Sequence, residues 1–289
     1  IVIFITYWHG QLDLIPLTIM IISIGLLKRN KIILSGILLA LSVASKHSIL
    51  IVFPFILVYI WSNKESIKDI YRFNIYFFAC IAALEFNLLF DYGFQEMVIH
   101  NPEVEKIYWL RLVISENIQI YILPIIYILL VYFVWRLKKI NYELIFISLG
   151  IAFGIFLLFT PASPGWFIWI TPMLALHLSK KGNRAEIFGI LLSIFFVIYH
   201  FLYSSGSQVI FLGDMTTFTK SFSILYQQKI QSSIYTSIII IILIIMIQML
   251  REGIKGNYYY NLGRRPIILG ISGSLERERK IFVNFVIDM

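Results

Sequence analysis

Residues 7–27, YWHGQLDLIPLTIMIISIGLL, join a short polar cluster to a long apolar run that ends in a basic turn. Asp13 can cap the following helix, because its carboxylate accepts hydrogen bonds from free N–H groups at the positive end of the helix dipole. Pro16 falls in the first turn, where its missing N–H costs little. His9 lies four residues before Asp13, so the two would share one face of a continuous helix. Together with Gln11 they predict a cluster of polar side chains at one end of an apolar helix. The alternative is a simple helix cap beside Tyr7 and Trp8, which would anchor the helix at the membrane interface.

The composition of the whole chain indicates a membrane protein. The 289 residues are 59% hydrophobic and 14% charged, with a mean hydropathy of +0.84, which an ordinary soluble domain does not reach. Only helices and closed barrels satisfy the backbone in lipid, and the alternating pattern of a barrel is absent. We therefore predict an all-α fold, a polytopic transmembrane helical bundle. Cys80 is the single cysteine, so no intrachain disulfide can form.

The apolar segments and the charges between them predict a topology. Nine segments can be drawn, at about 14–27, 32–45, 48–61, 73–90, 118–135, 143–159, 166–178, 187–203 and 233–250. Alternate connections carry sixteen basic residues on one side and five on the other, so the positive-inside rule assigns the first set to the cytoplasm. This asymmetry accounts for the net charge of +8 without a nucleic-acid partner. The domains are then residues 1–250, a transmembrane unit, and residues 251–289, a cytoplasmic tail.

Two connections on the opposite, outer side are long, residues 91–117 and 204–232. Both mix aliphatic and aromatic side chains with polar ones, and loops of this length usually are functional or contain interfacial helices. Residues 107–114 predict such a helix at the level of the lipid headgroups. The chain begins without Met and without the basic region of a signal peptide, so we expect it to continue a longer protein.

Polar groups that could carry chemistry gather at the outer ends of the predicted helices. A charge at the centre of a membrane helix costs roughly 2.5–3.5 kcal/mol on insertion scales, so such groups usually face a cavity or one another. Two interpretations of Lys46 follow: it pairs with Asp13 or Glu85, or it contacts a phosphate as a compact point charge. The polar groups at this depth are Asp13, Lys46, His47, Glu85, Asn87 and Asp91.

Other candidate motifs are weaker. His100, His177 and His200 show no partner at a recognisable spacing, and motifs of soluble hydrolases and metalloenzymes are absent. The run from Gly270 to Gly273 is similar to a phosphate-binding loop, but a working loop would need Gly-Lys where Leu-Glu follows.

The sequence HGQLDLIPLTIMIISIGLL, a basic turn, then ILSGILLALSVASKHSILIVFPFILVYIW resembles the core of the GT-C superfamily of integral membrane glycosyltransferases. The shared features are a Gly-Gln-x-Asp helix entry, a small-residue helix with Lys46 at its outer end, and a Pro-containing third helix. The later SPGWFIWITPML is similar to an outer-mouth segment of these enzymes. The resemblance covers about residues 5–180.

The resemblance implies a function. Its members take a sugar from a polyprenyl-phosphate donor at the non-cytoplasmic face and pass it to a lipid, glycan or protein acceptor. Their catalytic acidic residue, a general base or metal ligand, lies in a first outer loop that would precede Ile1, so the catalytic residue and any divalent cation stay unassigned. Asp13 and Lys46 match motif positions, whereas Glu85 does not. The candidate donor- and substrate-binding residues are His9, Gln11, Asp13, Lys46, His47 and Glu85.

Two other classes remain open: a polytopic transporter or flippase, and a non-catalytic lipid-binding subunit. A transporter predicts broken helices in two related halves, a pattern that we do not see. Residues 264–273 also resemble the opening strand and turn of uridine-kinase-like P-loop enzymes, which would make the tail the start of a second domain.

Overall fold

The computed structural model describes residues 1–8, 12–63, 67–137, 140–160, 162–181, 183–202 and 228–255. Within these residues the fold is mostly helical, which confirms the all-α class. Each of the nine predicted segments corresponds to one helix of eleven residues or more. These are α1 (Leu14–Lys28), α2 (Ile32–Ser45), α3 (Phe53–Asn63), α4 (Ile67–Glu85), α7 (Ile122–Trp135), α8 (Tyr142–Phe159), α9 (Phe167–Lys181), α10 (Asn183–Leu202) and α12 (Gln228–Lys255).

Short elements connect the long helices. A 3-10 helix, η2 (His47–Val52), joins α2 to α3, and η6 (Pro164–Trp166) precedes α9. Between α4 and α7 the chain forms a run of short elements and one hairpin: η3 (Leu88–Phe90), α5 (Tyr92–Phe94), η4 (Gln95–Ile99), α6 (Pro102–Glu105), η5 (Lys106–Tyr108), β1 (Arg111–Ser115) and β2 (Ile118–Tyr121). The N-terminal π-helix η1 is Phe4–Trp8.

Local sequence explains several helix boundaries. Asn141 caps α8, since its Oδ1 accepts a hydrogen bond of 2.7 Å from the backbone N–H of Leu144. Asn30 takes a positive φ of 61° in the tight turn between α1 and α2, a conformation that asparagine tolerates better than most residues. Asp13 occupies the N-cap position of α1 but makes no capping hydrogen bond. The predicted cap is therefore wrong, and the carboxylate has another partner, described below.

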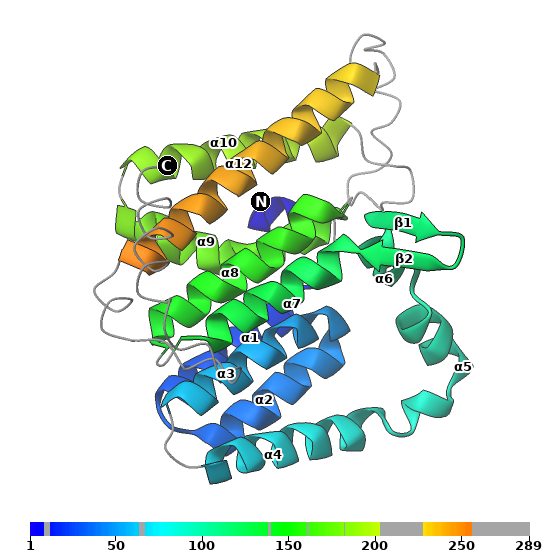
Figure 1. Ribbon diagram of the computed structural model, residues 1–289, viewed down its shortest axis with the longest axis vertical. Coiled ribbons are helices and arrows are strands. Elements are labelled where there is room, and N and C mark those ends of the chain that lie inside the picture. Colours follow the sequence, from blue (N-terminus) through cyan, green and yellow to red (C-terminus); the bar gives the residue numbers. More distant parts are fainter. Residues whose placement is uncertain are drawn as a thin grey trace.

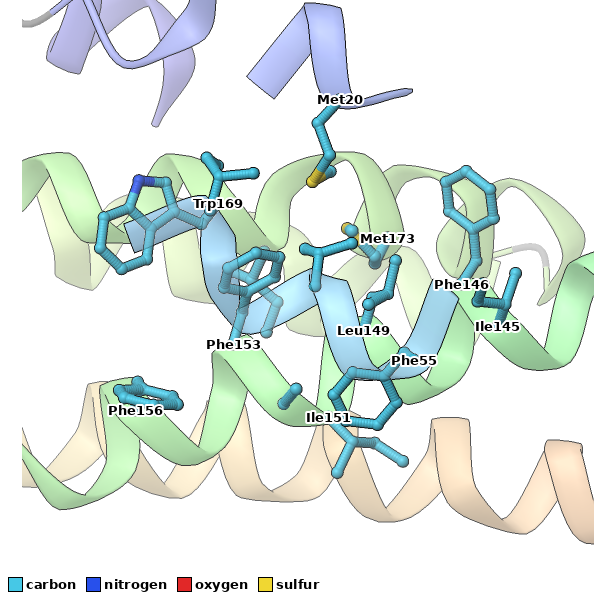
Figure 2. Packing of buried hydrophobic residues seen from close by; sticks show 14 of the residues in the cluster. Met20, Phe55, Ile145, Phe146, Leu149, Ile151, Phe153, Phe156, Trp169 and Met173 are labelled. Carbon is cyan, nitrogen blue, oxygen red and sulfur yellow. The ribbon is translucent and has the colours of Figure 1, made fainter. Parts of the chain in front are cut away.

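The core forms around α8, which packs against α7, α9 and α12. Thirteen consecutive residues of α8, 145–157, are buried. Figure 2 shows Phe153 and Leu149 of α8 among side chains from three other helices, namely Met20 of α1, Phe55 of α3, and Trp169 and Met173 of α9. The side chain of Phe153 lies 5.8 Å from the ring of Trp169, centroid to centroid.

A second layer consists of α1, α2 and α4. Helix α2 packs against both α1 and α4. A Cβ atom at Gly36 of α2 would lie 2.9 Å from the carbonyl oxygen of Phe73, so only glycine lets the two backbones approach this closely. On the α1 side the contact is polar: Ser23 bonds to Ser35, and Ser42 donates to the carbonyl oxygen of Pro16 at 2.6 Å.

The helices run back and forth along one direction, so their ends form two groups. In Figure 1 the turn between α1 and α2 and the start of α4 lie at the left, whereas residues 86–121 lie at the right. The turn between α1 and α2 contains Lys28, Arg29 and Lys31, and the start of α4 contains Lys68 and Arg72, all from the set that charge alternation assigned to the cytoplasm.

Two helices have the length and hydropathy needed to cross a membrane: Tyr142–Phe159 in α8 and Gln228–Arg251 in α12. They differ in surroundings, because 67% of the α8 window but only 33% of the α12 window is buried. Several other apolar helices are shorter, and fifteen residues rise only about 22 Å against a hydrocarbon core of about 30 Å. The part of the chain described here thus has two candidate spans, fewer than the nine segments predicted to cross.

The predicted interfacial helix at residues 107–114 is wrong. Residues 111–115 form β1, which pairs antiparallel with β2 through a turn at Glu116 and Asn117. Branched residues on both sides of a short polar turn favour a hairpin over a helix. The predicted fifth segment accordingly begins with a strand at residues 118–121. Residues 203–227, most of the second long loop, and residues 256–289 of the tail lie outside the described chain.

Candidate functional site

Asp13 and Lys46 form an ion pair between two helices. Lys46 follows α2 in an extended conformation, and its Nζ lies 3.0 Å from Oδ1 of Asp13 at the start of α1. The carboxylate side chain is only 9% exposed, whereas the lysine side chain is 36% exposed. Oδ2 of Asp13 is buried and has no hydrogen-bond partner among the described residues. The pair therefore has a buried negative end and a positive end that reaches the surface.

A second pair follows immediately in the sequence. Nε2 of His47 lies 3.0 Å from Oε1 of Glu85, in the last turn of α4. The carboxylate is again the buried partner, at 13% exposure against 41% for the imidazole. The two atoms are close but not aligned as a hydrogen bond, because Oε1 has no partner that satisfies the angular requirement. Consecutive residues thus join α2 to α1 and to α4.

The segment after α4 contacts the His47–Glu85 pair. Phe94 of α5 packs edge-on against the imidazole of His47, with ring centroids 5.9 Å apart. Asp91 caps α5, since its Oδ1 accepts a hydrogen bond of 2.8 Å from the backbone N–H of Phe94. Further along the segment Lys106 and Glu103 pair at 2.6 Å. The structure therefore brings the segment after α4 against His47 through an aromatic side chain that sequence reasoning did not single out.

This arrangement suits an anionic ligand. A lysine ammonium group has three donors, and Asp13 accepts one, which leaves donors for a second acceptor near the surface. The buried carboxylate orients the amine, and a protonated His47 would add a second positive group on the next residue. Within the described residues no group of three or more His, Cys, Asp or Glu side chains could hold a metal ion.

Of the six residues predicted to bind the donor or substrate, four form two pairs and two lie outside the described chain. The structure brings Asp13 together with Lys46, one of the two pairings considered from the sequence, and it brings His47 together with Glu85, which was not predicted. His9 and Gln11 lie outside the described residues. Whether any of the six binds a sugar donor stays a prediction. The adjacent residues Lys46 and His47 could have indicated two neighbouring pairs with carboxylates. The sequence alone does not say which carboxylate pairs with which residue.

The other histidines need one correction. His100 was assigned no partner, yet its Nδ1 lies 3.5 Å from Oε1 of Glu96, four residues earlier, a spacing that one helical turn brings together. His200 is 5% exposed and packs on the rings of Phe167 and Phe196. His177 is also buried, at 8% exposure.

Comparison with known proteins adds no relative: no family model matches the chain, no curated protein matches its sequence, and no solved structure matches its fold. Within the described residues, the case for a function therefore stands on the geometry of the Asp13–Lys46 and His47–Glu85 pairs.

Proposed function

We propose that this chain is part of a multi-pass membrane glycosyltransferase, which takes a sugar from a polyprenyl-phosphate donor and transfers it to an acceptor at the outer membrane face. The observation that carries the proposal is the Asp13–Lys46 pair, in which a buried carboxylate holds a partly exposed ammonium group at the end of α2. In the proposed complex the free donors of Lys46 bind the donor phosphate, where a charge-assisted hydrogen bond is strongest.

A membrane location is supported by apolar side chains on the outside of the helices. Phe78 of α4 is 56% exposed, Ile128 of α7 63%, and Ile240 of α12 50%. Water would not favour so much apolar surface on several helices at once, whereas lipid tails would cover it. The polar side chains of the α1–α2 contact are buried, as expected when polar groups avoid lipid.

The surroundings of the Asp13–Lys46 pair favour a substrate-binding site over a purely structural ion pair. Lys46 and His47 are the exposed members of their pairs, and residues 86–121 lie at the same end of the helices, with Phe94 on His47. In the proposed enzyme this segment covers Lys46 and His47 and restricts water at the transfer site.

The test measures binding of radiolabelled polyprenyl phosphate, the moiety common to all donors of this class, to the full chain in lipid nanodiscs. Lys46→Met keeps the length of the stem and removes the charge, so it should weaken binding about ten- to a hundred-fold, the equivalent of one charge-assisted hydrogen bond. Lys106→Met is the matched control, because Lys106 is also an outer lysine paired with a carboxylate. It should bind as the native protein does.

A double variant separates binding from stability. Lys46→Met alone leaves the buried Asp13 carboxylate without its partner, so misfolding could also weaken binding. Asp13→Asn combined with Lys46→Met removes both charges, and we expect it to fold well yet still bind weakly. Native affinity in this double variant would refute the phosphate contact and leave the ion pair as a structural contact between α1 and α2.

Transfer itself is tested with polyprenyl-phosphate sugars and native protein. If the chain binds the lipid phosphate but releases no sugar from any of a panel of such donors, the proposal of an enzyme is wrong. A non-catalytic lipid-binding subunit then becomes the better proposal.

A further inference from the structure

The β1–β2 hairpin exposes aliphatic side chains without a partner in the described chain. Leu112 is 58% exposed, Ile114 62% and Ile118 57%, and every residue of β1 is exposed. A sheet on a soluble surface usually turns polar residues outward, so such an aliphatic surface indicates contact with something other than water.

The strand register divides the hairpin into two unlike faces. Leu112 pairs with Ile120, and Ile118 shares that face because it lies two residues from Ile120. Ile114 stands next to the register shift between Val113 and Ser115 and adds to this aliphatic surface. The opposite face carries the pairs Arg111 with Tyr121 and Val113 with Gln119. One face of the hairpin is therefore aliphatic, and the other is mixed, with Val113 64% exposed beside Arg111 and Gln119.

The hairpin is attached directly to an apolar helix. β2 ends at Tyr121 and α7 begins at Ile122, whose N–H donates to the carbonyl oxygen of Leu110 at 3.1 Å. The rings of Tyr108 and Tyr121 meet edge-on at 5.0 Å, and the neighbouring Trp109 is 58% exposed. Tyrosine and tryptophan concentrate where apolar and aqueous regions of a membrane meet. α7 itself also exposes apolar side chains, at Ile125, Ile128, Leu129 and Tyr132.

We propose that the hairpin lies flat on the outer leaflet of the bilayer, with Leu112, Ile114 and Ile118 at the boundary between headgroups and acyl chains. The proposal rests on the membrane location proposed above but not on sugar transfer. The free strand edges keep unpaired backbone groups, which require water or headgroups and so exclude a deeper position. The mixed face, with Arg111 and Gln119, then faces the aqueous side.

Apolar burial, not charge, drives this contact. The segment around the hairpin has an excess of acidic side chains, with Asp91, Glu96, Glu103, Glu105 and Glu116 against Lys106 and Arg111. An anionic lipid surface would therefore not attract it, and zwitterionic lipid should suffice. Because the same segment contains Phe94, docking the hairpin on lipid would also hold this aromatic ring against His47.

The test uses nitroxide labels on single cysteines in the full chain, in phosphatidylcholine liposomes. Cys80→Ser removes the natural thiol, and labels are placed at positions 112, 114, 113 and 116 by the substitutions Leu112→Cys, Ile114→Cys, Val113→Cys and Glu116→Cys. We expect positions 112 and 114 to be accessible to oxygen and severalfold less accessible than position 116 to a water-soluble nickel chelate. Position 113, on the other face, should resemble position 116.

A label at Ile240→Cys on α12 separates failure of this inference from failure of the membrane location. Chelate access at positions 112 and 114 equal to that at 116, with 240 protected, overturns the hairpin proposal alone. Chelate access at 240 as well overturns the membrane location and the hairpin proposal together. Low access of both oxygen and chelate at 112 and 114 means that protein, such as a second copy, covers the aliphatic face, and this outcome also overturns the proposal. Added anionic lipid should leave the access pattern unchanged.

Discussion

Helices α8 and α4 are nearly equal in length, at eighteen and nineteen residues, yet they have opposite surroundings. α8 buries thirteen of its eighteen residues in the centre of the fold. α4 buries only Phe73 and Phe77 of its nineteen and exposes Ile75, Phe78 and Leu84 on its outer side. Part of the difference is local, because α4 has Lys68, Asp69 and Arg72 near its start, whereas α8 has Glu143 as its only charged residue. The rest teaches that an apolar run does not by itself say whether the remainder of the chain covers its side chains.

The largest expected effect comes from truncating one leucine in each helix and comparing the two losses of stability. Leu149→Ala in α8 should lower the free energy of unfolding by about 2–5 kcal/mol, because it empties a fully buried position. Leu84→Ala in α4 should change it by less than about 1 kcal/mol, since this side chain is 43% exposed. Unfolding of both variants in the same lipid bicelles gives the two values. Equal losses would mean that the exposed face of α4 packs against protein.

The next test concerns how α4 is attached. Gly36→Ala places a Cβ 2.9 Å from the carbonyl oxygen of Phe73, a backbone atom that cannot turn away. We expect a loss of about 1–3 kcal/mol from this overpacking, with faster amide hydrogen exchange in α4 than in α8. Gly25→Ala is the control, because its nearest neighbour, the hydroxyl of Tyr142, lies 4.0 Å away. Uniform loosening of both helices would contradict the view that α4 is a peripheral helix.

The other face of α2 provides a smaller test. Ser42→Ala removes the buried hydrogen bond to the carbonyl oxygen of Pro16 and should cost about 0.6–1.5 kcal/mol. Ser45→Ala is matched to it, since the Ser45 hydroxyl is exposed and bonds only to Leu41 within its own helix. Thermal unfolding should separate the two variants, and identical stability would show that the α1–α2 contact depends on shape alone.

The smallest expected effect lies at the C-terminal end of α4. Glu85→Gln removes the charge opposite His47, and because the imidazole is 41% exposed the cost should be about 0–1 kcal/mol and decrease with added salt. Hydrogen exchange in the last turn of α4 gives the most direct measurement. A loss larger than that of Ser42→Ala would make this pair a principal attachment of α4.

The existence of the long helices was predictable, because apolar runs bounded by polar or basic residues mark them. The bounds of α4 were not, since the run predicted at 73–90 corresponds to Ile67–Glu85, whose first turns are polar. Lys28 to Lys31 interrupt the first two runs, and Asn141 begins the α8 run with a side chain that suits an N-cap. The hairpin was missed for a physical reason: Trp109 to Ile114 have a composition that serves an interfacial helix or a strand equally well. Its strand character depends on pairing with residues 118–121.

The candidate site was predictable only in its composition. Asp13, Lys46, His47 and Glu85 could be placed at one end of their helices by counting residues along each run. Their partners could not be counted in this way, because Lys46 and His47 are adjacent and either could meet either carboxylate. Phe94 gave no signal at all, since one aromatic residue in an aromatic-rich segment is not distinctive.

The sequence by itself determined that this protein is helical and rich in apolar surface, and it determined roughly where its helices lie, because hydrophobicity and turn residues act locally. Only the tertiary structure decided that α8 is central and α4 peripheral, that Asp13 pairs with Lys46 instead of capping α1, and that Phe94 reaches His47. Those outcomes depend on which surfaces of distant segments fit together, and packing and pairing between them are not encoded at any single position.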